Sequence, residues 1–268
     1  MHIHFLDPFR ESDSPVHRLD PRVKFILAVA FIFTAALTPA GAWPVYLLLL
    51  SLVLSVELLC GLGIGYVLKR SMLALPFVLA AIPLVFTLPG EPLFSFSTGS
   101  LSLTISQPGV ERFLSIALKS WISVQAAIVL ASTTSFPDLL AAMRSVKIPS
   151  LLVSIFGLMW RYLFVLADEA LRLLRARQAR SGQTDRPGLK PGGSITWRGR
   201  VAGGMAGSLF LRAFERSDRI YMAMLARGYD GELRTSPLPP IQSGSRLLLY
   251  ASLVLFILLL AAAVLFWS

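Results

Sequence analysis

Long apolar runs separated by short polar turns dominate the pattern of this chain. A helix needs roughly 17 to 25 mostly apolar residues to cross the hydrocarbon core of a bilayer. Five runs meet this requirement: Val23 to Pro39, Val45 to Leu62, Met72 to Leu88, Phe113 to Thr134 and Leu247 to Trp267. The pattern therefore predicts an all-α integral membrane protein with about five transmembrane helices.

A sixth apolar run, Ile148 to Ala167, is interrupted by Arg161 and continues directly into an Arg-rich segment that ends at Arg180. Lys and Arg near span ends prefer the cytoplasm. If this run also crossed the bilayer, the Arg-rich segment would lie outside. We therefore interpret Ile148 to Arg180 as one long helix that starts against the cytoplasmic side of the bundle and leaves it.

The same charge rule gives a topology. Arg18, Arg22 and Lys24 precede the first span, whereas the loop from Pro89 to Glu111 contains no Lys or Arg. We expect the N-terminus in the cytoplasm, that loop outside and the C-terminus outside. The expected location is the plasma (inner) membrane, with lipid as the surroundings of the spans.

Breaks in the pattern divide the chain into three parts. Residues 1–135 hold the N-terminal segment and four spans, residues 136–233 form a cytoplasmic module of long helices, and residues 247–267 form the closing span. Residues 181–204 are rich in Gly and Pro, which break helices and strands. They are predicted to form a flexible linker inside the module.

The second half of the module has a helical pattern from Gly207 to Arg227. Phe210, Phe214, Tyr221 and Met224 recur three, four or seven residues apart and so share one face. This stripe packs either against the other long helix or against partner subunits.

Composition narrows the classes of function. The chain is 55% hydrophobic and only 15% charged, with a formal net charge of +10. Half of the positive charge is concentrated between Ala167 and Ser236, with 13 Lys and Arg against 7 Asp and Glu. There is one cysteine and no phosphate-binding loop motif. We expect no catalytic residue, no cofactor and no nucleic-acid partner.

His2 and His4 are two adjacent candidate metal ligands, but two imidazoles leave most of a coordination sphere empty. We expect them to be solvated and the chain to hold no metal site. Glu57 and Lys119 interrupt apolar runs near predicted span ends, and we expect both side chains to reach the interface. Arg161 pairs with Glu57 or lies at the membrane surface, and the sequence leaves both open.

Both long helices of the module end in a similar way. The first ends in Ala179, Arg180 and Ser181, and the second in Ala226, Arg227 and Gly228. An arginine fork grips a carboxylate through two parallel hydrogen bonds, and a glycine can terminate the helix in the left-handed conformation. Two such ends are what a membrane subunit would need to engage a dimeric partner, although a last-turn arginine also complements the helix dipole.

Two segments carry a family resemblance. The segment Ser14 to Phe25 (SPVHRLDPRVKF) and the segment Glu215 to Gly231 (ERSDRIYMAMLARGYDG) are similar to the transmembrane T components of energy-coupling factor (ECF) transporters, cobalt-type CbiQ above all. The resemblance covers nearly the whole chain. Ala226, Arg227 and Gly228 match the second Ala-Arg-Gly motif of that family, whereas Ser181 stands in the glycine position of the first.

The resemblance implies a non-catalytic subunit whose coupling helices dock into two ABC-type ATPase subunits. A separate S component would bind the substrate. The resemblance also implies cobalt uptake linked to cobalamin synthesis, while nickel or a vitamin stays open as the substrate. A self-contained permease or a membrane enzyme is the rival interpretation, and neither repeated halves nor a cluster of ionisable residues is visible in the sequence.

Overall fold

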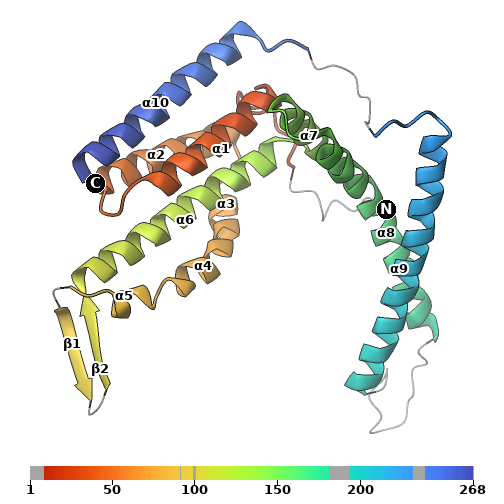
Figure 1. Cartoon of the computed structure of the whole chain (residues 1–268), viewed down its shortest axis with the longest axis horizontal. Coiled ribbons are helices and arrows are strands. Elements are labelled where there is room, and N and C mark those ends of the chain that lie inside the picture. Colours follow the sequence, from red (N-terminus) through yellow and green to blue (C-terminus); the bar gives the residue numbers. More distant parts are fainter. Residues whose placement is uncertain (1–8, 91, 99–100, 181–193, 232–238, 268) are drawn as a thin grey trace. The chain divides into compact units, whose positions relative to one another are not determined.

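The computed structural model describes residues 9–90, 92–98, 101–180, 194–231 and 239–267 (Figure 1). The chain divides into two compact units. One, here called the bundle, comprises residues 2–146 and 238–268. The other, here called the two-helix unit, comprises residues 147–237. We describe each in turn.

Five helices build most of the bundle: α1 (Pro21–Leu37), α2 (Trp43–Cys60), α6 (Gln107–Thr133), α7 (Phe136–Ser145) and α10 (Ser243–Trp267). Helix α1 contacts α6, α7 and α10, and α2 packs on α6. Their shared core contains Phe31, Leu49, Ile122 and Phe256. The rings of Phe31 and Phe256 meet edge to face with centroids 5.8 Å apart, an arrangement that aromatic pairs favour.

Three of these helices begin at a polar cap followed by proline. The side chain of Asp20 accepts a hydrogen bond from the backbone of Arg22, that of Ser106 from Gly109, and that of Ser135 from Asp138. Such caps satisfy N–H groups that have no partner inside the helix, and proline in the first turn loses no hydrogen bond. The sequence thus fixes where each helix starts.

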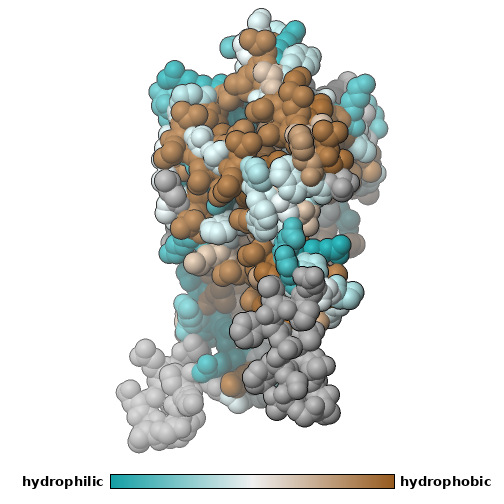
Figure 2. Space-filling model, turned by 90° about the vertical axis from the view of Figure 1, so that its left-hand side faces the viewer, coloured by the Kyte–Doolittle hydropathy of each residue, from teal (hydrophilic) through white to brown (hydrophobic). Residues whose placement is uncertain are grey.

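Apolar side chains also cover the outside of the bundle. Leu247, Ile257, Leu265 and Phe266 of α10 are exposed, and Figure 2 shows a broad apolar surface on this side of the bundle. A water-soluble protein rarely exposes apolar patches of this extent. The surface is the one expected of helices that face lipid.

The predicted third span is not one continuous helix. It is broken into α3 (Ile64–Ser71), a 3-10 turn (Met72–Ala74), α4 (Leu75–Ala80) and α5 (Leu84–Thr87). Pro76 lies in the first turn of α4 and Pro83 directly precedes α5. Proline cannot donate the hydrogen bond that a helix interior requires, so the segment predicted as the third span is found as the candidate span Gly65–Thr87, but with interruptions in its helix.

A short antiparallel hairpin, β1 (Pro92–Thr98) and β2 (Leu101–Ser106), occupies much of the segment predicted as a loop from Pro89 to Glu111. Thr98 pairs with Leu101 and Phe94 with Ile105. Helix α6 then begins at Gln107, six residues before the predicted start of the fourth span. The fold remains predominantly helical.

Among the described residues, five segments are long and apolar enough to cross a membrane. They are Trp43–Cys60, Gly65–Thr87, Gln107–Thr133, Ser150–Arg180 and Ser243–Trp267. The number equals the predicted one, but the helix that starts at Ser150 takes the place of the predicted first span. Helix α1, with 17 residues, lies at the lower limit of about 17 to 25 that a span needs.

The segment before α1 lies against the end of α6. Arg10 donates a backbone hydrogen bond to the Ser132 carbonyl (3.0 Å), and the buried Lys24 Nζ donates to the carbonyls of Thr133 (2.8 Å) and His17 (3.3 Å). The bonds to Ser132 and Thr133 satisfy carbonyls that the end of α6 leaves unpaired. Part of the segment Ser14 to Phe25 thus holds the chain before α1 against the bundle.

The two-helix unit consists of α8 (Ser150–Arg180) and α9 (Ile195–Leu225), each 31 residues long. The prediction that Ile148 to Arg180 forms one helix is confirmed, apart from the first two residues. Helix α7 packs in the bundle, and the two-helix unit runs from residue 147 to residue 237. The predicted bounds of the cytoplasmic module, residues 136 and 233, stay a prediction.

The segment between the two long helices is shorter than the predicted linker, residues 181–204. Ser194 caps α9 by accepting a hydrogen bond from the backbone of Trp197, and the helix continues through Gly199, Gly203 and Gly204. The prediction that residues 195–204 belong to the linker was wrong. Glycine inside a helix costs only about 1 kcal/mol relative to alanine, which a capped 31-residue helix tolerates. The remaining linker residues lie outside the described part.

Candidate functional site

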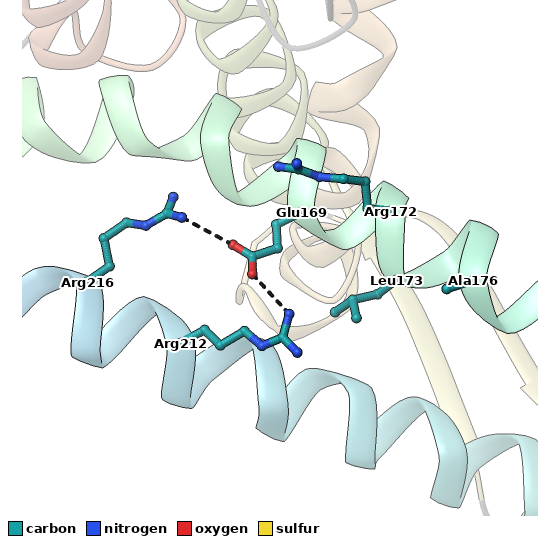
Figure 3. Close-up of a pocket in the computed structure, with 6 residues that line it drawn as sticks. All are labelled: Glu169, Arg172, Leu173, Ala176, Arg212 and Arg216. Atoms are coloured by element: carbon teal, nitrogen blue, oxygen red, sulfur yellow. Dashed lines mark hydrogen bonds and ion pairs between the residues drawn. The ribbon is translucent and has the colours of Figure 1, made fainter.

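Helices α8 and α9 are joined by one carboxylate between two arginines. Glu169 of α8 lies between Arg212 and Arg216 of α9, with the nearest N–O distances at 3.3 Å and 3.7 Å (Figure 3). The Glu169 side chain is only 14% exposed. Arg212 and Arg216 lie four residues apart, which places them on the same face of α9. We call these three residues the Glu169 clamp.

A pocket of about 380 Å³ surrounds the clamp. Arg172, Leu173 and Ala176 of α8 complete its lining. Figure 3 shows the two helices running in opposite directions, because the order from Glu169 to Ala176 along α8 is matched by the order from Arg216 to Arg212 along α9. The unit is therefore an antiparallel helix pair.

The first predicted helix end lies at the end of α8. Ala179 and Arg180 are the last two residues of the helix, and both are exposed. Ser181, the third residue of this candidate motif, lies outside the described residues. Arg180 thus projects from a helix terminus, where its charge is complementary to the helix dipole.

The second predicted end has a defined termination. Gly228 has φ +81°, its N–H donates to the Leu225 carbonyl, and the N–H of Tyr229 donates to the Met224 carbonyl, each at 3.0 Å. This pair of bonds is the Schellman motif, in which a left-handed residue ends a helix. The expectation that Gly228 adopts the left-handed conformation is confirmed. Ala226 and Arg227 lie in the final turn, and both are exposed.

The antiparallel arrangement puts the two arginines at opposite ends of the pair. From the level of the clamp, α8 continues eleven residues to Arg180, and α9 continues in the other direction nine residues from Arg216 to Leu225, with Arg227 in the turn that follows. The rise is about 1.5 Å per residue, and the turn of α9 between Arg212 and Arg216 adds to the length. The two ends therefore lie about 35 Å apart. A single rigid element could therefore contact two separate sites on a partner.

The predicted apolar stripe lies away from α8. Phe210, Phe214 and Tyr221 are 69%, 59% and 53% exposed, and Met224 is half-buried. At 100° per residue, the three aromatic residues lie on the side of α9 roughly opposite the clamp arginines. The sequence left two options for this stripe: packing on the other long helix or packing on a partner subunit. Within the described residues, the stripe does not pack on α8. The stripe is left available for a partner.

The three charged residues that interrupt apolar runs, Glu57, Lys119 and Arg161, have different surroundings. Glu57 is 2% exposed, so the expectation that it reaches the interface was wrong. It shares a face of α2 with the buried Val53 and Cys60, four residues before and three after. Lys119 donates to the carbonyl of Ala36 in the last turn of α1, at 3.3 Å. Arg161 is exposed within the two-helix unit.

No group of three or more His, Cys, Asp or Glu side chains gathers at a possible metal site within the described ranges. His2 and His4 lie outside those ranges. The Glu169 clamp was missed by the sequence analysis. The spacing of Arg212 and Arg216 was visible, but pairing them with Glu169, 43 residues before Arg212 in the chain, requires knowing the relative register of the two helices.

The long apolar helices and the charged helix pair define a multi-pass integral membrane protein. The family model described as cobalt transport protein, CbiQ, matches residues 12–237. The chain belongs to this family. It is a transmembrane component of an ECF-type transporter, since its relatives carry that description.

Named relatives span most of the chain. The cobalt transport protein CbiQ of Rhodobacter capsulatus is 29% identical over 186 residues, which cover 69% of this chain and 72% of that protein. The energy-coupling factor transporter transmembrane protein EcfT of Lactococcus lactis is 28% identical over 232 residues, 82% of each chain. The putative fused cobalt transport protein CbiMQ of Methanocorpusculum labreanum is 24% identical over 238 residues, 85% of this chain and 37% of that protein.

Proposed function

We propose that this chain is the coupling subunit of an ATP-driven importer, with Arg180 and Arg227 as the contacts to two ABC-type ATPase subunits. The observation that carries the proposal is the pair of exposed arginines at opposite ends of one clamped helix pair, about 35 Å apart by helix rise. Movement of the ATPases would then reach the membrane through a single element. The chain itself is non-catalytic in this proposal.

The two-helix unit would lie in the cytoplasm and the C-terminus outside, as the distribution of Lys and Arg indicates. A separate S component would bind the substrate, and the name of the fused relative, which joins CbiM to CbiQ, supports a membrane partner. The apolar stripe of α9 is available for such a partner. The names of two relatives favour cobalt over nickel or a vitamin.

Replacing Arg227 with Ala in the full transporter tests this assignment. Truncating a buried, charge-assisted contact at an interface costs about 2 to 5 kcal/mol, so recovery of the ATPases with the tagged chain should fall at least tenfold and uptake should stop. Arg227→Lys should restore only part of the recovery, because lysine lacks the planar fork. Arg219→Ala, on the same helix and exposed, is the matched control.

Arg180→Ala should act in the same direction but less severely, given Ser181 in the glycine position. Full ATPase recovery and uptake in the Arg227→Ala variant would refute the coupling role. Purification of the tagged chain without any ATPase, combined with substrate uptake by the chain alone in vesicles, would favour a self-contained permease. Uptake of radiolabelled cobalt, competed by unlabelled cobalt or nickel, distinguishes the substrates.

A further inference from the structure

The pocket around the Glu169 clamp carries more positive than negative charge. Three arginines and one carboxylate line it, together with Leu173 and Ala176. Each guanidinium has five N–H donors, and the single carboxylate can satisfy only a few of them. The lining therefore has a surplus of two positive charges and of hydrogen-bond donors.

The contacts inside the pocket are loose. The distances from Glu169 to Arg212 and Arg216, 3.3 Å and 3.7 Å, exceed the 2.7 to 2.9 Å that is usual for a tight charge-assisted hydrogen bond. In the part of the chain that the structure describes, Arg172 has no acidic group within 4.0 Å. Arg172 is one of the lining residues, and Figure 3 shows its side chain running along α8 with the guanidinium on the other side of the ribbon from the Glu169 carboxylate. An anion with several oxygens would meet donors that are not yet engaged.

The position of the pocket along α8 favours a lipid as the source of that anion. The first half of α8 presents large apolar side chains outward, including Leu151, Ile155 and Met159, and so can lie against the membrane. After Arg161, the next charged residues are Asp168 and Glu169. The pocket thus lies where the apolar half of the helix gives way to the polar half, which is the depth of lipid headgroups.

We propose that this pocket binds the phosphate headgroup of an anionic phospholipid. The arginine forks match the oxygens of a phosphate, the two surplus charges offset its negative charge, and Leu173 and Ala176 form an apolar wall beside it. Basic pockets at the membrane surface bind such headgroups in this way. The bound lipid would fix the depth of the helix pair relative to the bilayer surface.

The proposal rests on contact between the apolar half of α8 and the cytoplasmic surface of the membrane, and not on the coupling role of Arg180 or Arg227. The test uses the full chain purified in detergent, with phosphatidylglycerol added and bound lipid counted by native mass spectrometry. Phosphatidylcholine, inorganic phosphate and a soluble polyglutamate peptide are the comparison ligands. Arg172→Gln removes one lining charge without touching the clamp, and Arg175→Gln removes a charge from the same helix outside the lining.

We expect wild type to prefer phosphatidylglycerol over phosphatidylcholine. Arg172→Gln should weaken phosphatidylglycerol binding about fivefold, the effect of one arginine near a headgroup, and Arg175→Gln should leave it within twofold of wild type. If Arg172→Gln does not fold, Arg172→Lys against Arg175→Lys gives the same comparison, with a loss expected only at position 172.

Four results would overturn the proposal. Equal losses at positions 172 and 175 would mean general electrostatic attraction, and equal binding of the two lipids would mean that the headgroup is not read. Displacement of the lipid by equimolar inorganic phosphate would assign the pocket to free phosphate. Binding of polyglutamate that depends on Arg172, without binding of phosphatidylglycerol, would assign it to an acidic protein segment. ATPase recovery is not a readout here, so the two proposals fail independently.

Discussion

Removing the charge of Glu169 is expected to loosen the pair formed by α8 and α9. In the Glu169→Gln variant the side chain keeps its size, but Arg212 and Arg216 lose their shared carboxylate, whose oxygens lie 3.3 Å and 3.7 Å from them. Both guanidiniums are partly exposed, so each pair contributes about 0.2 to 1 kcal/mol. Without the carboxylate, repulsion between the two arginines, which lie four residues apart, destabilises the pair by about a further 0.2 to 0.5 kcal/mol.

Together these effects amount to about 0.6 to 2.5 kcal/mol of the free energy that holds the two helices together, with a middle value near 1.5 kcal/mol. Since 1.4 kcal/mol is a factor of ten, amides of α8 and α9 beside the clamp should exchange hydrogen roughly ten times faster. Hydrogen–deuterium exchange with mass spectrometry measures this directly. The difference should shrink at high salt, because salt screens exposed ion pairs.

Glu215→Gln is the matched control. Glu215 is also on α9, but it is 69% exposed, and its one ion-pair partner among the described residues is Arg219 of the same helix, at 4.0 Å. Its removal should leave exchange beside the clamp unchanged. Equal exchange in wild type and Glu169→Gln would refute the clamp. So would strict additivity of Glu169→Gln and Arg212→Gln in a double-mutant cycle, because residues that interact do not add.

Three further outcomes are expected. Gly228→Ala should destabilise the end of α9 by about 1 kcal/mol, because φ is +81° there. Gly207→Ala, inside the helix and with open space around the residue, should stabilise α9 by a similar amount. Local hydrogen exchange compares the two variants. Lys24→Met should lower the free energy of unfolding in detergent by about 1.5 to 3 kcal/mol, since it removes the bonds to Thr133 and His17, while the exposed Lys69→Met should change it little. Reporter fusions should place the C-terminus outside, and an external protease should not cut residues 181–204 in intact cells; cleavage there would refute the topology.

The spans predicted most accurately from the sequence are those whose interior contains no helix-breaking proline. The predicted runs Val45 to Leu62 and Leu247 to Trp267 correspond to α2 and α10 within a few residues. The run from Met72 to Leu88 is equally apolar, but two prolines divide it. Hydropathy measures burial in lipid and not the hydrogen bonds of the backbone, so it finds the segment and misses the breaks.

The linker and Glu57 show two further limits. Counting breakers extended the linker into α9 because a local count ignores the cap at Ser194 and the length of the helix that follows. For Glu57, distance from the span end was the wrong criterion. The buried residues Val53 and Cys60 place it on the face of α2 that packs in the bundle. Helical periodicity could not indicate this face, because the sequence of α2 is apolar on every side.

The two candidate helix ends could be found from sequence because each is local, an arginine followed by a break. Their separation could not, because it depends on the register in which α8 and α9 pack. That register places Glu169 between Arg212 and Arg216, and thereby determines how far apart Arg180 and Arg227 lie. Two fixed sites on a dimeric partner would require a fixed separation. If the coupling proposal is right, a slip of one helical turn at the clamp would move one end by about 5.4 Å, more than a hydrogen bond can bridge. The clamp would then matter for coupling although it touches neither ATPase.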